Sequence, residues 1–301
     1  MTSSGGAVQI EALDGFALGA TLHSARPSRG VALIVSGAMA VPQTYYGDFA
    51  RAAAARGFDV VTYDYRGIGA SRPAAHAGSL RGFRAAAADW MRLDFEGVHR
   101  WVRRELEPQR VAVVGHSFGG NAFGLAPSAH CIDGGVFVAA QSGYWRHWAA
   151  PRRYLYAALW HGVSPLLPRI VGYMPGWAAL GNDVPRDAMI EWSSWCRRPG
   201  YAAEGAARRG FSAVRAPLKF LSFADDTAYA PRAAVEALVR TYDGAASEHQ
   251  HIEPRAHGLA RVGHFGFFRP SARVLWPLAL DWLARHTRLD RPAPVSTVGA
   301  L

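Results

Sequence analysis

A serine between two glycines follows a short apolar run and is the residue most suited to chemistry. Val111 to Val114 lead into Gly115-His116-Ser117-Phe118-Gly119. A serine hydroxyl acts as a nucleophile when a sharp strand-to-helix turn exposes it, and small neighbours let strand and helix approach without Cβ clashes. The N-terminus of the following helix would favour developing negative charge. The pattern therefore predicts that Ser117 is a nucleophile and not an incidental serine in a glycine-rich turn.

Such a serine needs a base, and the base needs an acid to orient it. Val262-Gly263-His264-Phe265-Gly266 places a histidine between glycines shortly before the last helical stretch. His257 is the rival base, but it lies seven residues earlier and lacks the second glycine. We therefore expect His264 to be the base.

The acid should follow a strand at the same sheet edge and lie between the serine and the histidine in the chain. The apolar run 218–223 ends in Ala224-Asp225-Asp226, so the order Ser117, aspartate, His264 is satisfied. Asp225 comes first after the strand and is expected to face the site. Asp226 would then point outward or cap the turn by bonding local N–H groups.

Two backbone N–H groups must hold the oxyanion of an acyl-transfer reaction. The amide of Phe118, directly after the nucleophile, is the first candidate. The second should come from the loop after the strand 31–36, in Gly37-Ala38-Met39. We expect it to be Ala38, with Met39 as the alternative.

Strand-like and helical stretches alternate along the chain, which is typical of an α/β fold with a mainly parallel sheet. An opening hairpin over residues 8–23 precedes the alternation. The expected strands are 31–36, 59–63, 110–114, 135–140 and 217–223. The expected helices are 46–56, 89–105, 121 onward, 232–242 and 272–286.

The character of the chain changes between residues 142 and 211, where six of the ten tryptophans lie. We interpret 142–211 as a helical cap inserted into a core made of 1–141 and 212–288, with 289–301 as a frayed tail. The cap aromatics could serve packing, line an apolar substrate pocket, or form an amphipathic segment on a lipid surface. The pocket candidates are Met39, His116, Trp145 and Trp148.

Composition excludes several classes of function. The net charge of +10 comes from scattered arginines without a basic block, so nucleic-acid binding is not expected. Cys131 and Cys196 are interpreted as small buried residues rather than a disulfide framework. His249-x-His251 lacks a third ligand, so no metal site is expected. No signal peptide and no run of 18 apolar residues is present, which predicts a cytoplasmic protein without a membrane span.

Four stretches resemble the α/β-hydrolase fold, in the serine-hydrolase group of esterases, lipases and serine aminopeptidase-like proteins. They are VVGHSFGG, YDYRGIGAS, SFADD and VGHFGFF, and they span about residues 30 to 285. SGAMAVPQTYY, EWSSWCRRPGY and VGHFGFFR are similar to an uncharacterised bacterial subgroup of predicted α/β hydrolases. One departure concerns the oxyanion loop, because the common His-Gly pair is Ser36-Gly37 here. Asp64 and Arg66 of DYRGIGAS are interpreted as structural.

The resemblance implies the α/β-hydrolase fold and an esterase mechanism that requires no cofactor. Ser117 would attack the acyl carbonyl of a small-molecule ester or thioester, with His264 as base and Asp225 fixing its tautomer. Phe118 and Ala38 would hold the oxyanion, and water would release the acid. Acyl transfer on the same triad and a non-catalytic ligand-binding protein on this fold stay open, as do monomer and homodimer.

Overall fold

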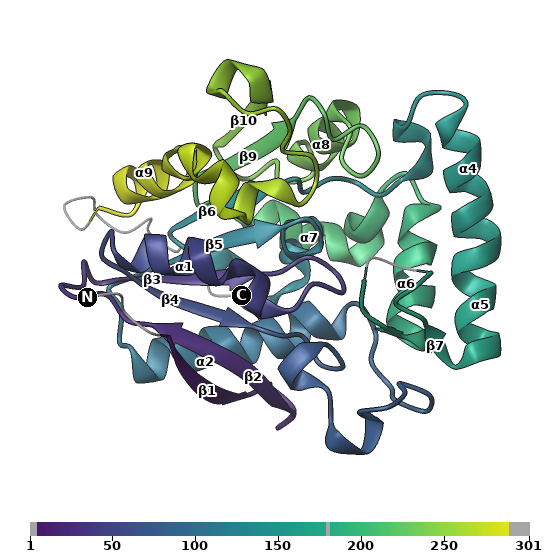
Figure 1. The fold of residues 1–301 in the computed structure, drawn as a ribbon, viewed down its shortest axis with the longest axis horizontal. Helices are drawn as coiled ribbons and strands as arrows, with labels where there is room; N and C mark the ends of the chain where they lie inside the picture. Colours follow the sequence, from purple (N-terminus) through teal and green to yellow (C-terminus); the bar gives the residue numbers. More distant parts are fainter. Residues whose placement is uncertain (1–4, 179–180, 289–301) are drawn as a thin grey trace, which may run out of the picture.

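The computed structural model describes residues 5–178 and 181–288. An eight-stranded sheet runs through the middle of the molecule in the order β1-β2-β4-β3-β5-β6-β9-β10, and helices cover its faces (Figure 1). β1 and β2 pair antiparallel, β2 joins β4 antiparallel, and all other neighbours are parallel. The predicted α/β architecture with a mainly parallel sheet is therefore confirmed. The predicted tail, 289–301, lies outside the described residues.

The strands are β1 Gly6–Glu11, β2 Ala17–His23, β3 Val31–Ser36, β4 Phe58–Tyr63, β5 Arg110–His116, β6 Gly134–Val138, β9 Leu218–Phe223 and β10 Ser247–Ile252. A separate hairpin pairs β7 Tyr173–Met174 with β8 Val184–Pro185. The α-helices are α1 Gly47–Ala54, α2 Glu96–Glu105, α3 Phe118–Asn121, α4 Arg152–Ala158, α5 Ser164–Val171, α6 Arg186–Cys196, α7 Arg208–Ala213, α8 Arg232–Val239 and α9 Trp276–His286.

The central strands form because their side chains are buried on both faces. β3, β6 and β9 consist of buried residues throughout, as parallel strands covered by helices require. β10 differs, because it lies at the edge of the sheet and its first five residues are all polar. This polar composition explains why the sequence pattern did not predict it as a core strand.

The helix expected after Ser117 is wrong in length. α3 is a single turn, and tight 3₁₀ turns Phe123–Leu125 and Pro127–Cys131 replace the rest. Gly124 packs closely against α7, since a Cβ on Gly124 would lie 2.4 Å from the Phe211 ring. Pro127 follows three residues later. A single turn has little macrodipole, so the field expected behind the serine is weak.

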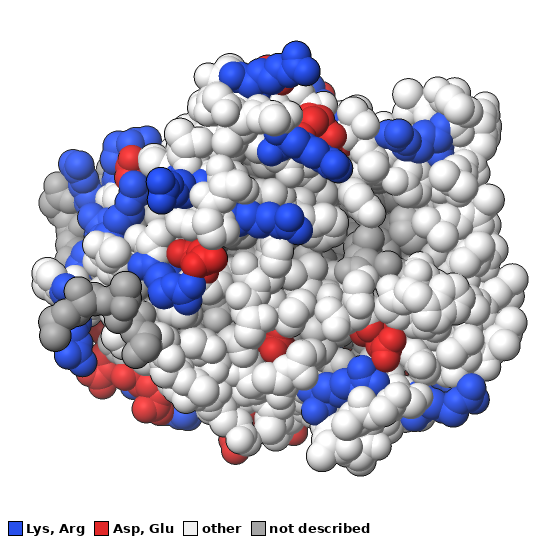
Figure 2. Space-filling model, in the orientation of Figure 1, with Lys and Arg blue, Asp and Glu red and all other residues white. Residues whose placement is uncertain are grey.

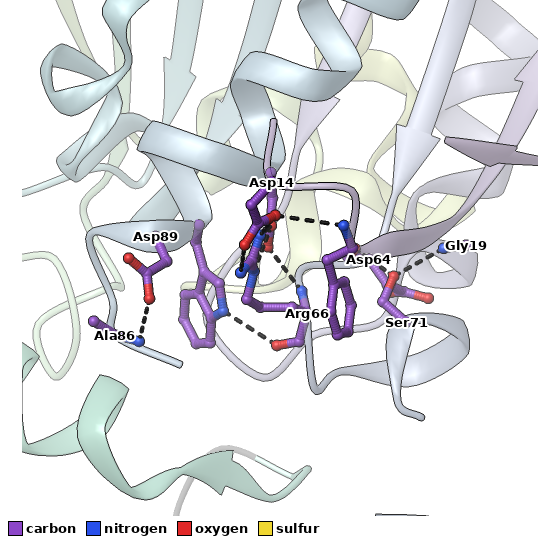
Figure 3. Close-up of polar contacts among 10 residues, drawn as sticks. Asp14, Gly19, Asp64, Arg66, Ser71, Ala86 and Asp89 are labelled. Carbon is purple, nitrogen blue, oxygen red and sulfur yellow. Dashed lines mark hydrogen bonds and ion pairs between the residues drawn. The ribbon is translucent and has the colours of Figure 1, made fainter. Parts of the chain in front are cut away.

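The loop after β4 is held by buried ionic and polar contacts, as Figure 3 shows. Arg66 bonds Asp94 through Nε at 2.6 Å and Asp14 through both terminal nitrogens at 2.8 Å. Asp64 accepts N–H groups from Gln43 at 2.6 Å and Ala70 at 2.8 Å. These contacts tie the loop to neighbouring loops, which supports the structural interpretation of Asp64 and Arg66.

The segment interpreted as a cap lies beyond the end of the sheet, with α4, α5 and α6 side by side at the right of Figure 1. α4 continues through a π-helical turn, η8 Leu159–Val163, into α5. No helix of the described part of the chain is long and apolar enough to cross a bilayer. Cys196 is buried as expected, but Cys131 is exposed at the end of its 3₁₀ turn, so that prediction is wrong.

Candidate active site

Ser117 occupies a strained turn at the end of β5. Its φ of 47° and ψ of −111° lie in a region that residues with a Cβ rarely adopt. The glycines around it are sterically required, since a Cβ on Gly119 would lie 2.1 Å from the Ser36 carbonyl oxygen. A Cβ on Gly115 would lie 2.8 Å from the Gly119 backbone. This geometry is the sharp strand-to-helix turn that the sequence predicts.

The acid that contacts the histidine is Asp226 and not Asp225, which corrects the expectation from sequence. His264 Nδ1 and Asp226 Oδ2 are 2.7 Å apart, and both side chains are almost completely buried. Asp225 is exposed and instead accepts the N–H groups of Val262 and Gly263 at 2.8 and 2.9 Å. Asp225 therefore holds the loop that carries the histidine, while Asp226 holds the histidine ring.

A tight turn explains the exchange of roles. The N–H of Asp226 donates to the Phe223 carbonyl at 3.0 Å, which closes a turn directly after β9. Ala224 and Asp225 are its two corner residues, so Asp225 points away from the sheet edge. Asp226, the fourth residue, returns to that edge, and its Oδ1 also accepts the Tyr229 N–H at 3.1 Å.

His264 lies in the loop after β10, with Phe265 and Tyr229 against its ring. The ring centroids are 4.9 Å from Phe265 and 5.0 Å from Tyr229. Because Nδ1–H donates a hydrogen bond to Asp226, Nε2 is left as the nitrogen without a proton. His257, the rival base, lies on a separate 3₁₀ turn, Pro254–His257, and does not hold the Asp226 contact.

Ser117 follows β5 and His264 lies in the loop after β10, but among the contacts of the described residues no hydrogen bond joins their side chains. The residue before the serine makes the contact instead, since His116 Nε2 lies 3.0 Å from the His264 carbonyl oxygen. Catalytic hydrogen bonds are often long before substrate binds and shorten in the reacting complex.

His116 is part of a buried chain of hydrogen bonds. A carbonyl only accepts, so His116 Nε2 carries the proton and Nδ1 accepts from the Tyr46 hydroxyl at 2.9 Å. Burial raises the pKa of Tyr46 well above its usual value and, together with the nearby His264, lowers the pKa of His116 to about 3. Both groups therefore stay neutral at ordinary pH, and the tautomer is fixed. His116 is fully buried and is not among the residues that line the cavity described below, contrary to its prediction as a pocket residue.

The same chain of hydrogen bonds includes the amide of Ala38, one of the two expected oxyanion donors. The Ala38 N–H donates to the Tyr46 oxygen at 2.8 Å, which conflicts with the expectation that Ala38 faces a substrate. Within residues 5–178 and 181–288, the N–H groups of Met39 and Phe118 have no hydrogen-bond acceptor. Neither of these two amides is therefore occupied by an acceptor, unlike that of Ala38.

Two tyrosines fix the loop where the common histidine is replaced by Ser36. Ser36 Oγ lies 3.0 Å from the Tyr63 hydroxyl and 2.8 Å from the Tyr65 hydroxyl. The Tyr65 hydroxyl is also 3.0 Å from the Gly37 carbonyl oxygen. The serine thus leaves room for a tyrosine cluster that braces the turn.

A cavity of about 330 Å³ lies between the cap helices and the core. Met39 reaches it from the oxyanion loop, and Tyr229 reaches it from beside His264. Its other lining residues are Ala40, Gln141, Gly143, Trp148, Tyr156, Leu159, Trp160, Ser164, Met174, Ala178, Val184, Met189, Trp192 and Ala228. None of the lining side chains carries a charge, so the cavity fits an uncharged, largely apolar group.

The structure separates the four pocket candidates. Met39 and Trp148 line the cavity, whereas Trp145 does not and packs beside Tyr144, His161 and the Arg146 guanidinium. Sequence reasoning missed Tyr229, whose only signal was its position three residues after the acid. The two histidines considered for a metal, His249 and His251, both contact Ser222 Oγ. No group of three metal-binding side chains occurs among the described residues.

Comparison with known protein families agrees with the fold. Residues 3–275 match the sequence profile of the alpha/beta hydrolase family, and the chain therefore belongs to that family. No curated protein sequence matches the chain significantly.

Several solved structures share the fold. A monoglyceride lipase from Saccharomyces cerevisiae, solved as a soluble variant with a substrate analogue, superposes with a TM-score of 0.66 at 14% identity, covering 95% of this chain and 98% of that one. The α/β hydrolase GrgF from Penicillium sp. gives 0.60 at 19% identity, covering 94% and 99%. The Pyrococcus furiosus esterase Pf2001 gives 0.59 at 14% identity, covering 94% and 92%. At these identities the likeness concerns the fold.

Proposed function

We propose that this protein hydrolyses carboxylic esters, or thioesters, of small uncharged acyl groups through Ser117, His264 and Asp226. The observation that carries the proposal is the buried 2.7 Å contact between Asp226 and His264, at the sheet edge where β5 presents a strained serine. A buried carboxylate on Nδ1 orients the ring and stabilises the imidazolium that forms when Nε2 accepts the serine proton.

The reaction follows from these groups. His264 Nε2 takes the Ser117 proton as Oγ attacks the acyl carbonyl. The tetrahedral oxyanion then accepts hydrogen bonds from the N–H groups of Phe118 and Met39. His264 then protonates the leaving alcohol, and an acyl-enzyme remains on Ser117. Water, deprotonated by the same nitrogen, attacks the ester carbonyl, and collapse releases the acid and restores the serine.

The cavity bounds the acyl group. At about 30 Å³ for each water, 330 Å³ holds roughly eleven waters, so an acyl chain of about ten non-hydrogen atoms would fill it. Its uncharged wall argues against a peptide amino terminus as substrate, because a buried ammonium needs a carboxylate partner. Activity on p-nitrophenyl esters should therefore rise with acyl length and fall once the chain exceeds about ten atoms.

A fluorophosphonate probe tests the nucleophile directly. The wild-type protein should become labelled at Ser117, and Ser117→Ala should neither label nor turn over an aryl ester. Ser128→Ala, at a serine buried away from the cavity, is a matched control that should label normally. A wild-type protein that never labels and hydrolyses no aryl ester would favour the non-catalytic alternative, and labelling that survives in Ser117→Ala would refute the serine assignment.

A further inference from the structure

The outer surface of the cap exposes apolar side chains that no part of the described chain covers. Nine large hydrophobic residues are strongly exposed among the described residues, and six of them lie between residues 154 and 177. They are Tyr154, Leu155, Val163, Leu166, Ile170 and Trp177, with exposures of 63, 68, 49, 57, 75 and 83%. Single exposed hydrophobic residues are common, but a concentration of this kind marks an interaction surface.

Four of these residues form a stripe along one continuous helical stretch. α4, η8 and α5 follow one another without a break from residue 152 to residue 171. Leu155, Val163, Leu166 and Ile170 are separated by eight, three and four residues, a helical spacing that places them on one face. We call these four residues the cap stripe.

Other residues of the same stretch line the cavity. Tyr156, Leu159, Trp160 and Ser164 belong to its wall, while no residue of the cap stripe does. Ala178 of the wall is the neighbour of Trp177, the most exposed hydrophobic residue of the described chain. The exposed Trp177 therefore lies directly beside the wall of the cavity in the chain.

The charged residues around the exposed face, from residue 134 to residue 182, are all arginines. From residue 134 to residue 182 the chain has no aspartate or glutamate, but it has Arg146, Arg152, Arg153 and Arg169. None of these four arginines takes part in an ion pair with an acid of the described residues. Figure 2 shows the surface over α4 and α5 as largely uncharged, with basic groups at its upper and lower ends.

We infer that the cap stripe docks the protein onto an anionic lipid surface, from which ester substrates enter the cavity. Apolar side chains enter the headgroup region while arginines at the ends of the helical stretch contact lipid phosphates, which is how amphipathic helices bind bilayers without crossing them. A protein partner with an acidic groove would need carboxylates opposite four separate arginines, whereas an anionic membrane provides charge everywhere. The inference deepens the proposed function, on which it rests, by naming a lipid-borne ester as the substrate class.

Vesicle flotation tests the docking without relying on catalysis. Ser117→Ala protein should float with phosphatidylcholine vesicles that contain phosphatidylglycerol, and less with phosphatidylcholine alone or in high salt. Adding Leu155→Gln, Leu166→Gln and Ile170→Gln should lower the bound fraction at least about tenfold, because three inserted aliphatic side chains are lost. Val274→Gln, which removes a comparably exposed residue far from the cap in sequence, should bind as the parent does.

Activity measurements separate this inference from the proposed function. With Ser117 intact, the triple variant should hydrolyse a water-soluble aryl ester at the wild-type rate but lose activity on an ester embedded in anionic vesicles. Flotation without any esterase activity would refute the proposed function and uphold the docking surface. Equal flotation of the parent and the triple variant would overturn the inference. Absence of flotation would also overturn it, and a dimer that the three substitutions dissociate would then identify the stripe as a contact between copies of this chain.

Discussion

Replacing each of the two neighbouring aspartates by asparagine tests the assignment of the acid most sharply. Asp226→Asn keeps the size of the side chain but removes the charge 2.7 Å from His264 Nδ1, in a position that is 1% exposed. The asparagine offers either a neutral oxygen or an N–H group, and the second choice selects the wrong tautomer of the imidazole. Loss of the corresponding acid in a serine protease costs about 10⁴ in kcat, or about 5.5 kcal/mol of transition-state stabilisation.

Asp225→Asn should behave differently because its contacts are structural. Its carboxylate accepts two backbone N–H groups, and the amide oxygen of asparagine keeps at least one of them. Hydrogen bonds to a charged group contribute about 1.5–3 kcal/mol, and the exposure of Asp225 places the loss at the lower end. We expect about 1–2 kcal/mol less stability in urea unfolding and at most about a tenfold decrease in kcat.

The assay is kcat on a p-nitrophenyl ester, with thermal unfolding to confirm that each variant is folded. Comparing the two variants controls for the added amide, since they differ only in which of two adjacent residues carries it. An Asp225→Asn variant that is folded and loses as much kcat as Asp226→Asn, or more, would refute the reasoning from the turn.

Three other substitutions have definite expected outcomes. Tyr46→Phe should lower the free energy of unfolding by about 1–3 kcal/mol, measured in urea, because the buried Nδ1 of His116 and a loop amide lose their partner; an unchanged midpoint would contradict the buried chain. Gly119→Ala should abolish fluorophosphonate labelling, because its Cβ would lie 2.1 Å from a carbonyl oxygen at the end of β3, whereas Gly266→Ala, which meets only ordinary contacts beyond 3.4 Å, should label normally. His99→Gln should make the free energy of unfolding less dependent on pH in acid. Burial, with the nearby Arg103, lowers the pKa of His99 in the folded protein to about 4, so the unfolded chain binds the extra proton. In the wild type, stability is therefore lost as pH falls from about 6.5 to 4, by up to about 3 kcal/mol. An equally steep loss of stability with falling pH in this variant would show that other groups cause it.

The parts of the fold that follow from sequence are those fixed by local pattern. Buried strands such as β3 and β9 are continuous apolar runs, and the strained serine turn is marked by glycines whose Cβ atoms would clash. β10 was not predicted as a core strand because it lies at the edge of the sheet, where five consecutive polar residues remain partly in contact with water. The helix after Ser117 was overestimated because tertiary packing of α7 on Gly124, which favours the tight turn, is invisible in the sequence.

The choice between two adjacent aspartates could not be predicted, because it depends on a single hydrogen bond. Counting from the end of β9 favours Asp225, but the bond from the Asp226 N–H to the Phe223 carbonyl folds the chain back by one tight turn. That turn exchanges the inward and outward positions, and an extended chain would have given the opposite result. Spacing therefore locates an acid to within a residue, and the turn type decides which of the two contacts the histidine.

The oxyanion loop leads to the same conclusion from another direction. Whether Ala38 or Met39 donates to an oxyanion depends on which N–H lacks an acceptor, and the Tyr46 hydroxyl occupies that of Ala38. That hydroxyl is held in turn by His116, whose tautomer is fixed by the carbonyl of His264. The Ala38 amide is thus occupied through a buried chain of hydrogen bonds that ends on the backbone of His264. Because the loop of Gly37, Ala38 and Met39 and the loop that carries His264 share this chain, a change at Tyr46 or His116 should disturb both together.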